Sequence, residues 1–296
     1  MSRIHKKTNG KIKRTGGERV VYLVIGILFF VYALTLFVPF LWLIMSSFKP
    51  FADYTLDLTA GKPFKLPEVW QWGNYVNAFK MMSVNGVSFL RMFFNSLWQT
   101  ALPITVSVLV SSAFAYTIAT FDFKGKTLIY TLVITVMIMP VIGNGGATFK
   151  LYRQLGLYDS PLLSIVQATG FGSFLYYHAF FKSVSKDYRE AVYIDGGGEF
   201  TTFFHIILPQ AVPLISSLAV IDFIARWNDY MSILLYLPSY PSVGSGLYIL
   251  KNTFLITGKD TIYYAGSVIG MLPTLILFIA FSDKIMKNMS MGGLKG

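Results

Sequence analysis

Two short stretches of the sequence place charged side chains among long apolar runs. The first, EAVYIDGGGEFTTFFHIILPQAVP at residues 190–213, combines acids and a histidine with three adjacent glycines and two prolines. The second, IDFIARWNDYM at residues 221–231, sets two aspartates and an arginine within an apolar segment. Carboxylates and a guanidinium can form charge-assisted hydrogen bonds and ion pairs. Such groups can bind a partner, line a polar path or hold helices together.

No catalytic arrangement accompanies these charges. KGKT at 124–127 resembles the end of a phosphate-binding loop, but position 120, where that loop needs glycine, is threonine. GFG at 170–172 lacks the third glycine of a dinucleotide site. The three histidines have no metal-ligand spacing, and no nucleophile lies beside a base. We therefore expect no catalytic residue, no metal and no cofactor, and the chain itself is not predicted to be an enzyme.

The composition is that of a membrane protein. Of the 296 residues, 54% are hydrophobic and only 13% are charged, against about 25% charged residues in soluble domains. The mean hydropathy is +0.56. The net charge of +11 could suggest nucleic acid, but the basic residues cluster at the ends of apolar runs. An anionic lipid surface is therefore the expected partner, not nucleic acid.

Six apolar runs are long enough to predict an all-α, polytopic protein with six membrane spans. The first run follows a basic lead, as in a signal peptide, but it is too long and no small-residue cleavage site follows. It is predicted to be a retained span after a tail of residues 1–19, so that 20–296 form one transmembrane domain. Pro140 and GNGG at 143–146 interrupt the third run. The predicted spans are 20–44, 92–120, 128–149, 161–181, 211–237 and 262–281.

The basic residues orient the chain. With the N-terminus inside, the inside segments hold 15 Lys or Arg and the outside segments hold 9. Because cytoplasmic loops carry the excess of basic residues, both termini are expected in the cytoplasm, and the protein in the cell membrane. The inside segments are then 1–19, 121–127, 182–210 and 282–296.

The polar stretch is predicted to be a helix–turn–helix in the cytoplasmic loop of about 182–210. KDYREAVYI can form two helical turns, and the three glycines at 196–198 then break the helix and permit a positive φ. EFTTFFHII is helical again, and Leu208-Pro209 is expected to end it. The apolar residues at amphipathic spacing in the second helix are Phe200, Phe203, Phe204 and Ile207.

The charge of this loop favours a protein partner. Acids stand at 187, 190, 195 and 199 against three bases. The alternative is a loop that rests on lipid headgroups, but such a loop favours Lys and Arg. An amphipathic helix pair suits docking into a groove of another protein.

The charged residues of the fifth span leave two interpretations open. Charge at mid-membrane is costly, so such residues usually face the interior of a bundle. Asp222 and Arg226 share a helix face, as do Arg226 and Asp229. They form either a structural ion-pair cluster or, together with Asn228, the polar lining of a pore or gate. Trp227 either packs in the core or stacks on a sugar ring.

The spacing in the polar stretch resembles the EAA loop of ABC-importer permeases, which reads Glu-Ala-Ala, three residues, Gly, nine residues, Ile, one residue, Leu-Pro. Two positions depart from the pattern: Val192 replaces the third alanine and Gly197 replaces the alanine after the glycine. LGLYDSPL (155–162), WNDY (227–230) and GGLKG (292–296) resemble the carbohydrate-uptake branch, particularly subunits like the smaller maltose permease. The matching residues are Glu190, Ala191, Asp195, Gly196, Phe203, Ile206, Leu208 and Pro209.

This resemblance implies the type I ABC-importer permease fold and the uptake of a carbohydrate, in particular an oligosaccharide. It implies two ATP-binding cassette subunits that hydrolyse ATP, a second permease that is a different chain, and an external solute-binding protein. Glu190 would pair with a basic residue of the ATPase, Ala191 would allow close approach and Gly196 would form the turn. The alternatives are a permease for another solute, a transporter driven by an ion gradient and a membrane-embedded enzyme.

Overall fold

The computed structural model describes residues 16–139, 143, 145–168 and 171–291. The chain divides into two compact units, Met1–Gln71 and Trp72–Gly296, which are described separately. Within the described residues the protein is mostly helical, not all-α, because one short hairpin of two strands accompanies the helices.

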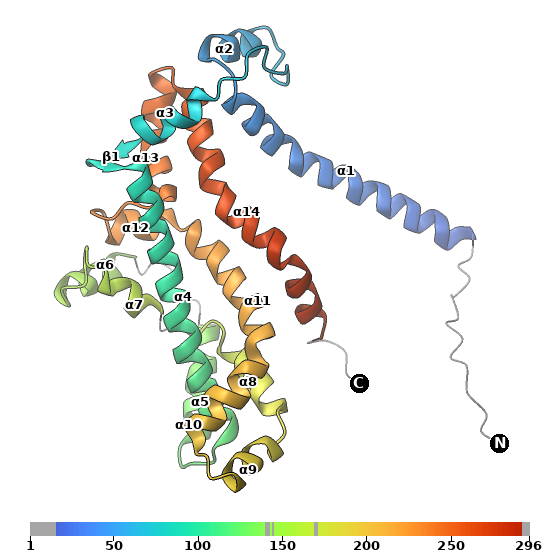
Figure 1. The fold of residues 1–296 in the computed structure, drawn as a ribbon, viewed down its shortest axis with the longest axis vertical. Coiled ribbons are helices and arrows are strands. Elements are labelled where there is room, and N and C mark those ends of the chain that lie inside the picture. The colour runs from blue at the N-terminus through green and yellow to red at the C-terminus, as the bar shows by residue number, and fades with distance from the viewer. Residues whose placement is uncertain (1–15, 140–142, 144, 169–170, 292–296) are drawn as a thin grey trace. The chain divides into compact units, whose positions relative to one another are not determined.

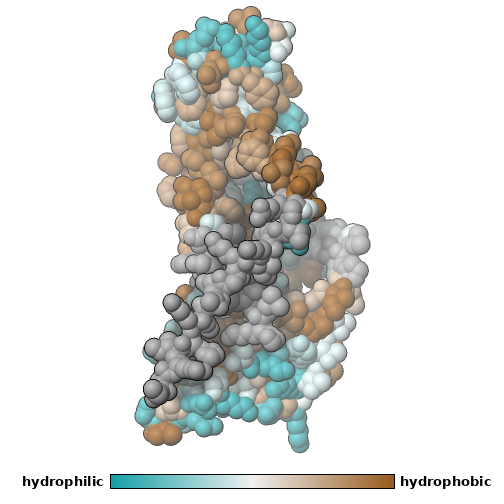
Figure 2. Space-filling view, turned by 90° about the vertical axis from the view of Figure 1, so that its right-hand side faces the viewer, coloured by the Kyte–Doolittle hydropathy of each residue, from teal (hydrophilic) through white to brown (hydrophobic). Residues whose placement is uncertain are grey.

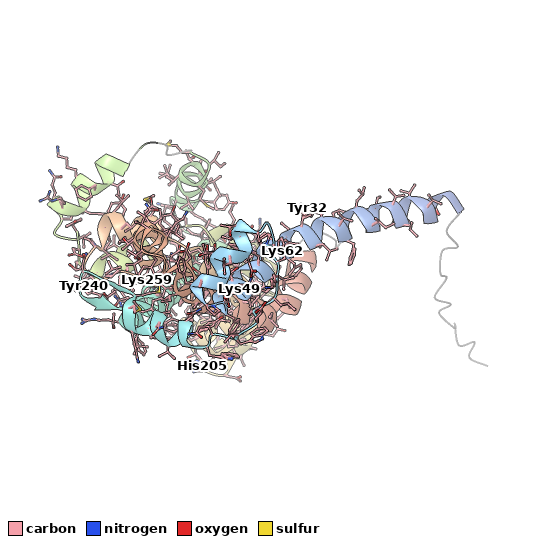
Figure 3. All side chains as sticks on the ribbon, turned by 90° about the horizontal axis from the view of Figure 1, so that it is seen from above. Tyr32, Lys49, Lys62, His205, Tyr240 and Lys259 are labelled. Carbon is pink, nitrogen blue, oxygen red and sulfur yellow. The ribbon has the colours of Figure 1, made fainter. Side chains whose placement is uncertain are left out.

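The first unit contains α1 (Gly16–Ser47) and α2 (Phe51–Thr59). From residue 20 to residue 41 the side chains of α1 are exposed or half-buried, although nearly all are apolar. Figure 3 shows them projecting along the length of the helix, with Tyr32 labelled. A helix of this length that is apolar all round is stable in a bilayer. The first predicted span is therefore present as one helix.

A buried ion pair holds the end of the first unit together. Lys49 Nζ donates to Asp57 Oδ2 at 2.7 Å, and Lys65 Nζ lies 3.7 Å from Asp57 Oδ1. The hydrogen bond from Lys49 lowers the pKa of Asp57 against the opposing effect of burial. Lys49, labelled in Figure 3, is almost fully buried, which a lysine tolerates when its charge is paired.

The second unit is built around α4 (Phe89–Thr120), a long helix in Figure 1 that packs against α3, α7, α8, α11 and α13. Small buried side chains, Ser111, Ser112 and Ala115, let α8 approach α4 closely. Before α4 come α3 (Gly73–Met81) and the hairpin of β1 (Ser83–Val84) and β2 (Val87–Ser88), in which Ser83 pairs with Ser88.

Two apolar cores lie at different levels of α4. One surrounds Phe89 and Met92 near its start and includes residues of α13 and α14, and the other surrounds Ala115 and Tyr116 near its end and includes residues of α8 and α11. The remaining elements are α5 (Lys126–Ile138), α6 (Gly145–Gln154), α7 (Leu162–Ala168), α8 (Phe174–Ser183), α9 (Asp187–Ile194), α10 (Glu199–Thr201), the π-helix η1 (Thr202–Ile207), α11 (Leu208–Trp227), α12 (Tyr230–Tyr236), α13 (Val243–Ile256) and α14 (Asp260–Met291).

Four helices of the described chain, not six, are long and apolar enough to cross a membrane: Val20–Ser47, Phe89–Thr120, Glu199–Trp227 and Asp260–Ser282. The third predicted span contains α5, which ends at Ile138 because Met139 precedes a proline and adopts an extended backbone. Part of that span, 140–142 and 144, lies outside the described residues. The fourth is divided between α7 and α8 rather than formed by one helix.

Candidate functional site

The polar stretch forms the helix–turn–helix that the sequence predicts. We call residues 186–209 the polar segment. Helix α9 ends where Gly196 takes a φ of +78°, a left-handed conformation that only glycine adopts without strain. The turn is closed by hydrogen bonds from Gly196 N to Tyr193 O and from Gly197 N to Val192 O, the latter at 2.8 Å. After Gly198, α10 begins with Glu199.

The two departures from the family pattern compensate each other in space. A Cβ at Gly197 would lie 2.6 Å from Val192 Cγ1 and 3.1 Å from Val192 O. Valine is stiff at χ1, so its methyl group cannot easily move away. The larger side chain at 192 therefore requires the smaller residue at 197.

The second helix of the polar segment continues through Pro209, contrary to the prediction that Leu208-Pro209 would end it. Glu199–Trp227 is one helix of 29 residues. Its turn at 202–207 is a π-helix, in which Leu208 N donates to Phe203 O, five residues back. Pro209 then lies in the first turn of α11, where the missing N–H is tolerated. The wider π turn is the kind of feature that often occurs at functional sites.

Only half of the predicted amphipathic set is buried. Phe203 and Ile207 pack against the apolar core beside Tyr116, and the rings of Phe203 and Tyr116 are 4.9 Å apart. Phe204 is exposed, and Phe200 is 83% exposed. Ile194, at the end of α9, is 85% exposed. Ile206 and Leu208 are half-buried.

The acidic residues of the family motif point away from the core. Glu190, Ala191 and Asp195 are exposed, as is Pro209. In the described part of the chain the Glu190 carboxylate has no hydrogen-bond or ion-pair partner. It is therefore available to a partner molecule. In Figure 2 hydrophilic residues gather at the lower end of the view, the end at which α9 lies in Figure 1.

Glu199 is the centre of a hydrogen-bond network. In the sequence it stands out only as one of four acids in the polar segment. Its Oε1 accepts from Arg189 and, at 2.6 Å, from the hydroxyl of Tyr193. Its Oε2 accepts from the hydroxyl of Tyr116, on α4, at 3.2 Å. The Arg189 guanidinium also lies over the ring of Phe121, 4.7 Å from its centre. No local pattern signals the contact with α4, because Tyr116 is 83 residues away from Glu199 in the chain.

A cavity of about 500 Å³ lies between the end of α4, the end of α8 and α9. Lys182 and Lys186 line it, together with Arg189, and Glu190 stands at its wall. Asp122, also on the wall, is held by Lys126, whose hydrogen bond at 2.9 Å lowers the pKa of the aspartate. The cavity therefore carries both signs of charge beside the exposed face of α9.

On α11 the structure brings two of the three predicted charges together. Arg226 Nε donates to both carboxylate oxygens of Asp222 at 3.0 Å. The side chains are 25% and 33% exposed, so the pair lies at the surface of this chain. Asp229 was expected on the same helix face as Arg226, but it lies outside this helix, because α11 ends at Trp227. It instead caps α12, accepting from Ser232 N at 3.1 Å.

The two residues that follow Arg226, Trp227 and Asn228, both make structural contacts within this chain. Trp227 is buried, and its Nε1 donates to Gly270 O of α14 at 2.8 Å. Its ring stacks on Phe223 at 5.4 Å. This geometry corresponds to the packing interpretation of Trp227, not to an open sugar platform. Asn228 ends α11, and its Nδ2 donates to Ile224 O at 2.8 Å.

The 155–162 motif also has a structural contact. Asp159 adopts a positive φ of 56°, and its N donates to Tyr236 O at 2.8 Å. Its carboxylate accepts from Ser239 N at 2.9 Å and from Ser239 Oγ at 2.6 Å. The motif therefore joins the start of α7 to the end of α12.

The described residues offer no group of three or more His, Cys, Asp or Glu side chains that could hold a metal ion. What the site offers is an exposed acidic helix, an apolar rim and an ion pair on a long apolar helix. These features suit binding and movement of helices.

Comparison with known proteins supplies the family context. The sequence profile of the binding-protein-dependent transport system inner membrane component matches residues 119–288. The chain is 27% identical to the diacetylchitobiose uptake system permease protein NgcG of Streptomyces coelicolor, over 90% of this chain and 86% of that protein. It is 28% identical to the trehalose/maltose transport system permease protein MalG of Thermococcus litoralis, over 87% and 91%.

Similarity also extends to solved structures. A bacterial ABC transporter involved in the import of the acidic polysaccharide alginate matches with a TM-score of 0.75 at 19% identity, over 91% of this chain and 98% of that chain. At this identity the likeness concerns the fold.

Among relatives in sequence, the arabinooligosaccharides transport system permease protein AraQ of Bacillus subtilis is 26% identical over 93% of this chain and 97% of that protein.

Proposed function

Because this chain belongs to the family of binding-protein-dependent transport system inner membrane components, we propose that it is the permease of an ATP-driven importer for a carbohydrate, in particular an oligosaccharide. The observation that carries the substrate class is the set of relatives along nearly the whole chain, named for the uptake of diacetylchitobiose, trehalose/maltose and arabinooligosaccharides. ATP is hydrolysed on separate subunits. The chain moves substrate only through its own change of conformation.

The polar segment is the proposed docking site for an ATP-binding cassette subunit. Glu190 is exposed and has no partner in the described chain, so a basic residue of the ATPase can pair with it. Ala191 beside it leaves room for close approach, and Gly196 forms the turn. Ile194 and Phe200 add an exposed apolar rim, and buried aromatic anchors supply much of the energy of interfaces.

The assembled importer is proposed to hold two such ATPases, a second and different permease chain, and an external solute-binding protein. The family description itself names dependence on a binding protein. We also propose six spans, with α5 and the α7–α8 pair completing the four long helices. The 13 residues of α5 cover only about 20 Å as a helix, so neighbouring chain must complete that span.

The ion pair on α11 is proposed to face the pore or the second permease. Asp222 and Arg226 lie partly exposed on a helix long enough to cross the membrane. Lipid penalises exposed charge at mid-membrane by about 2.5–3.5 kcal/mol on insertion scales. A polar path or a protein neighbour removes most of that penalty.

The proposed function is tested by reconstitution. Liposomes that hold the purified chain alone are expected to show no concentrative uptake when ATP is supplied. Liposomes that hold the complete complex, with its binding protein, are expected to accumulate at least one of a panel of radiolabelled diacetylchitobiose, trehalose, maltose and arabinooligosaccharides. Uptake by the single chain along an ion gradient would instead show that it is a secondary transporter. Accumulation of only non-carbohydrate solutes by the complete complex would contradict the proposed substrate class.

Both termini are proposed to lie in the cytoplasm, which the absence of cysteine from the sequence makes simple to measure. Single cysteines at Gly10, Gly293 and Lys124 are expected to resist a membrane-impermeant thiol reagent in intact cells and to react after permeabilisation. A cysteine at Ile256, which is 85% exposed, is expected to react in intact cells. The reverse pattern would invert the orientation and place the polar segment outside.

A further inference from the structure

The polar segment contains a glycine turn between two helices, and side-chain contacts connect the two helices across this turn. Three adjacent glycines, 196–198, separate α9 from α10. Glycine has more backbone freedom than any other residue. Gly196 and Gly198 have space around a Cβ position, so side-chain packing does not hold them. Without another connection, α9 could tilt relative to the long helix that begins at Glu199.

Glu199 provides that connection. One carboxylate oxygen accepts from Arg189 and Tyr193, both on α9, while Glu199 itself starts α10. The bond therefore spans the glycines directly. The Glu199 and Arg189 side chains are 28% and 33% exposed, so the pair is partly exposed. Burial lowers the pKa of Arg189, but hydrogen bonds to Tyr193 and Glu199 raise it above its usual value.

The same carboxylate also reaches a third helix. Its other oxygen accepts from Tyr116, on α4, one turn before that helix ends. The Arg189 guanidinium over Phe121, the residue that caps α4, makes a second contact between α9 and the end of α4. Three helices therefore meet at Glu199, and two of them, α4 and the helix that continues from α10, are long enough to cross a membrane.

We propose that Glu199 is a positioning residue that makes α9, α10 and the end of α4 move as one body, so that a displacement of α9 reaches two membrane-spanning helices instead of being lost at the glycine turn. This inference rests on the proposed function, in which ATPases displace α9. Two distant sites are coupled when both of them shift the equilibrium of one structural element that has two arrangements.

The test measures the distance between α9 and α4 in the complete complex. Spin labels are attached to cysteines that replace Thr117 on α4 and Tyr188 on α9, both exposed, with the other subunits made cysteine-free. Electron paramagnetic resonance then gives the distance distribution with and without ATP and vanadate. For the otherwise native chain we expect one narrow distribution that the nucleotide does not shift.

Glu199→Ala is expected to broaden this distribution and to make it shift with ATP and vanadate. Tyr116→Phe removes only the hydroxyl that reaches α4, and we expect a smaller broadening. The charge exchange R189E/E199R is expected to narrow the distribution again. Glu68→Ala is the control, because it removes an exposed acid whose partner Lys65 is three residues away, and it should change nothing.

A purely structural role for Glu199 predicts something different. The variant would then lose thermal stability while the labelled distance stayed narrow and independent of nucleotide, and that result would overturn the inference. If Glu199→Ala fails to assemble, Tyr116→Phe decides, and an unchanged distribution in it overturns the inference as well. A native complex without ATPase activity would contradict the proposed function itself, which separates the two failures.

Discussion

Replacing Glu190 with lysine is expected to abolish ATP-driven uptake while the chain remains folded and inserted in the membrane. The carboxylate is exposed, without a partner in the described chain, so the change removes no contact on which the fold depends. At the ATPase it would place two positive charges together. A hydrogen bond to a charged group contributes about 1.5–3 kcal/mol, so its loss alone weakens docking by about 10- to 100-fold.

The measurement is copurification of the ATPase with the variant, together with uptake in cells. Glu68→Lys is the control for the same change of charge, since Glu68 is exposed and its partner Lys65 is three residues away. We expect it to transport normally. Glu190→Gln keeps an acceptor oxygen and should retain partial uptake. Normal copurification and uptake by Glu190→Lys would show that α9 does not dock through this residue.

Replacing Arg226 with alanine is expected to raise ATPase activity in the absence of substrate, or to cause substrate leak, with little change in the melting temperature of the isolated chain. The pair with Asp222 is formed within one helix and is partly exposed. Pairs at this spacing stabilise a helix by only about 0.2–0.5 kcal/mol. In the assembled pore the remaining carboxylate of Asp222 would lose its partner, and an unpaired charge in a span is costly.

Two variants separate charge from packing in this experiment. Asp222→Ala with Arg226→Ala removes both charges, and it should restore a low basal ATPase rate if the unpaired carboxylate causes the defect. Arg226→Lys keeps the charge and should remain close to the native rate. A large fall in the melting temperature of the isolated Arg226→Ala chain, with an unchanged ATPase rate in the complex, would assign the pair to the fold of this chain alone.

The helix–turn–helix of the polar segment could be predicted because its signals are local. Helical spacing on either side and three glycines between them lie within about two dozen residues. The same local reasoning failed at Pro209. The rule that proline ends a helix assumes α geometry, and the π turn at 202–207 places this proline in a first turn, where it is accepted.

Helical spacing also could not predict which apolar residues of the second helix are buried. Phe200, Phe203, Phe204 and Ile207 all fit one amphipathic face, yet only Phe203 and Ile207 are buried. A π turn rotates the side chains that follow it relative to an α-helix, because it takes more residues per turn. The exposed pair remains at the surface that a partner can reach.

The sequence by itself determined that this is a membrane protein with long apolar runs and an acidic, glycine-broken segment. It predicted six spans, whereas four helices of the described chain are long and apolar enough to cross a membrane. Those properties follow from hydropathy and spacing, which each short stretch carries alone. The tertiary structure alone decided that Trp227 is packed and that Glu199 joins α9 to α4. These outcomes depend on which side chains meet after folding, and partners 43 and 83 residues apart in the chain leave no pattern in either segment.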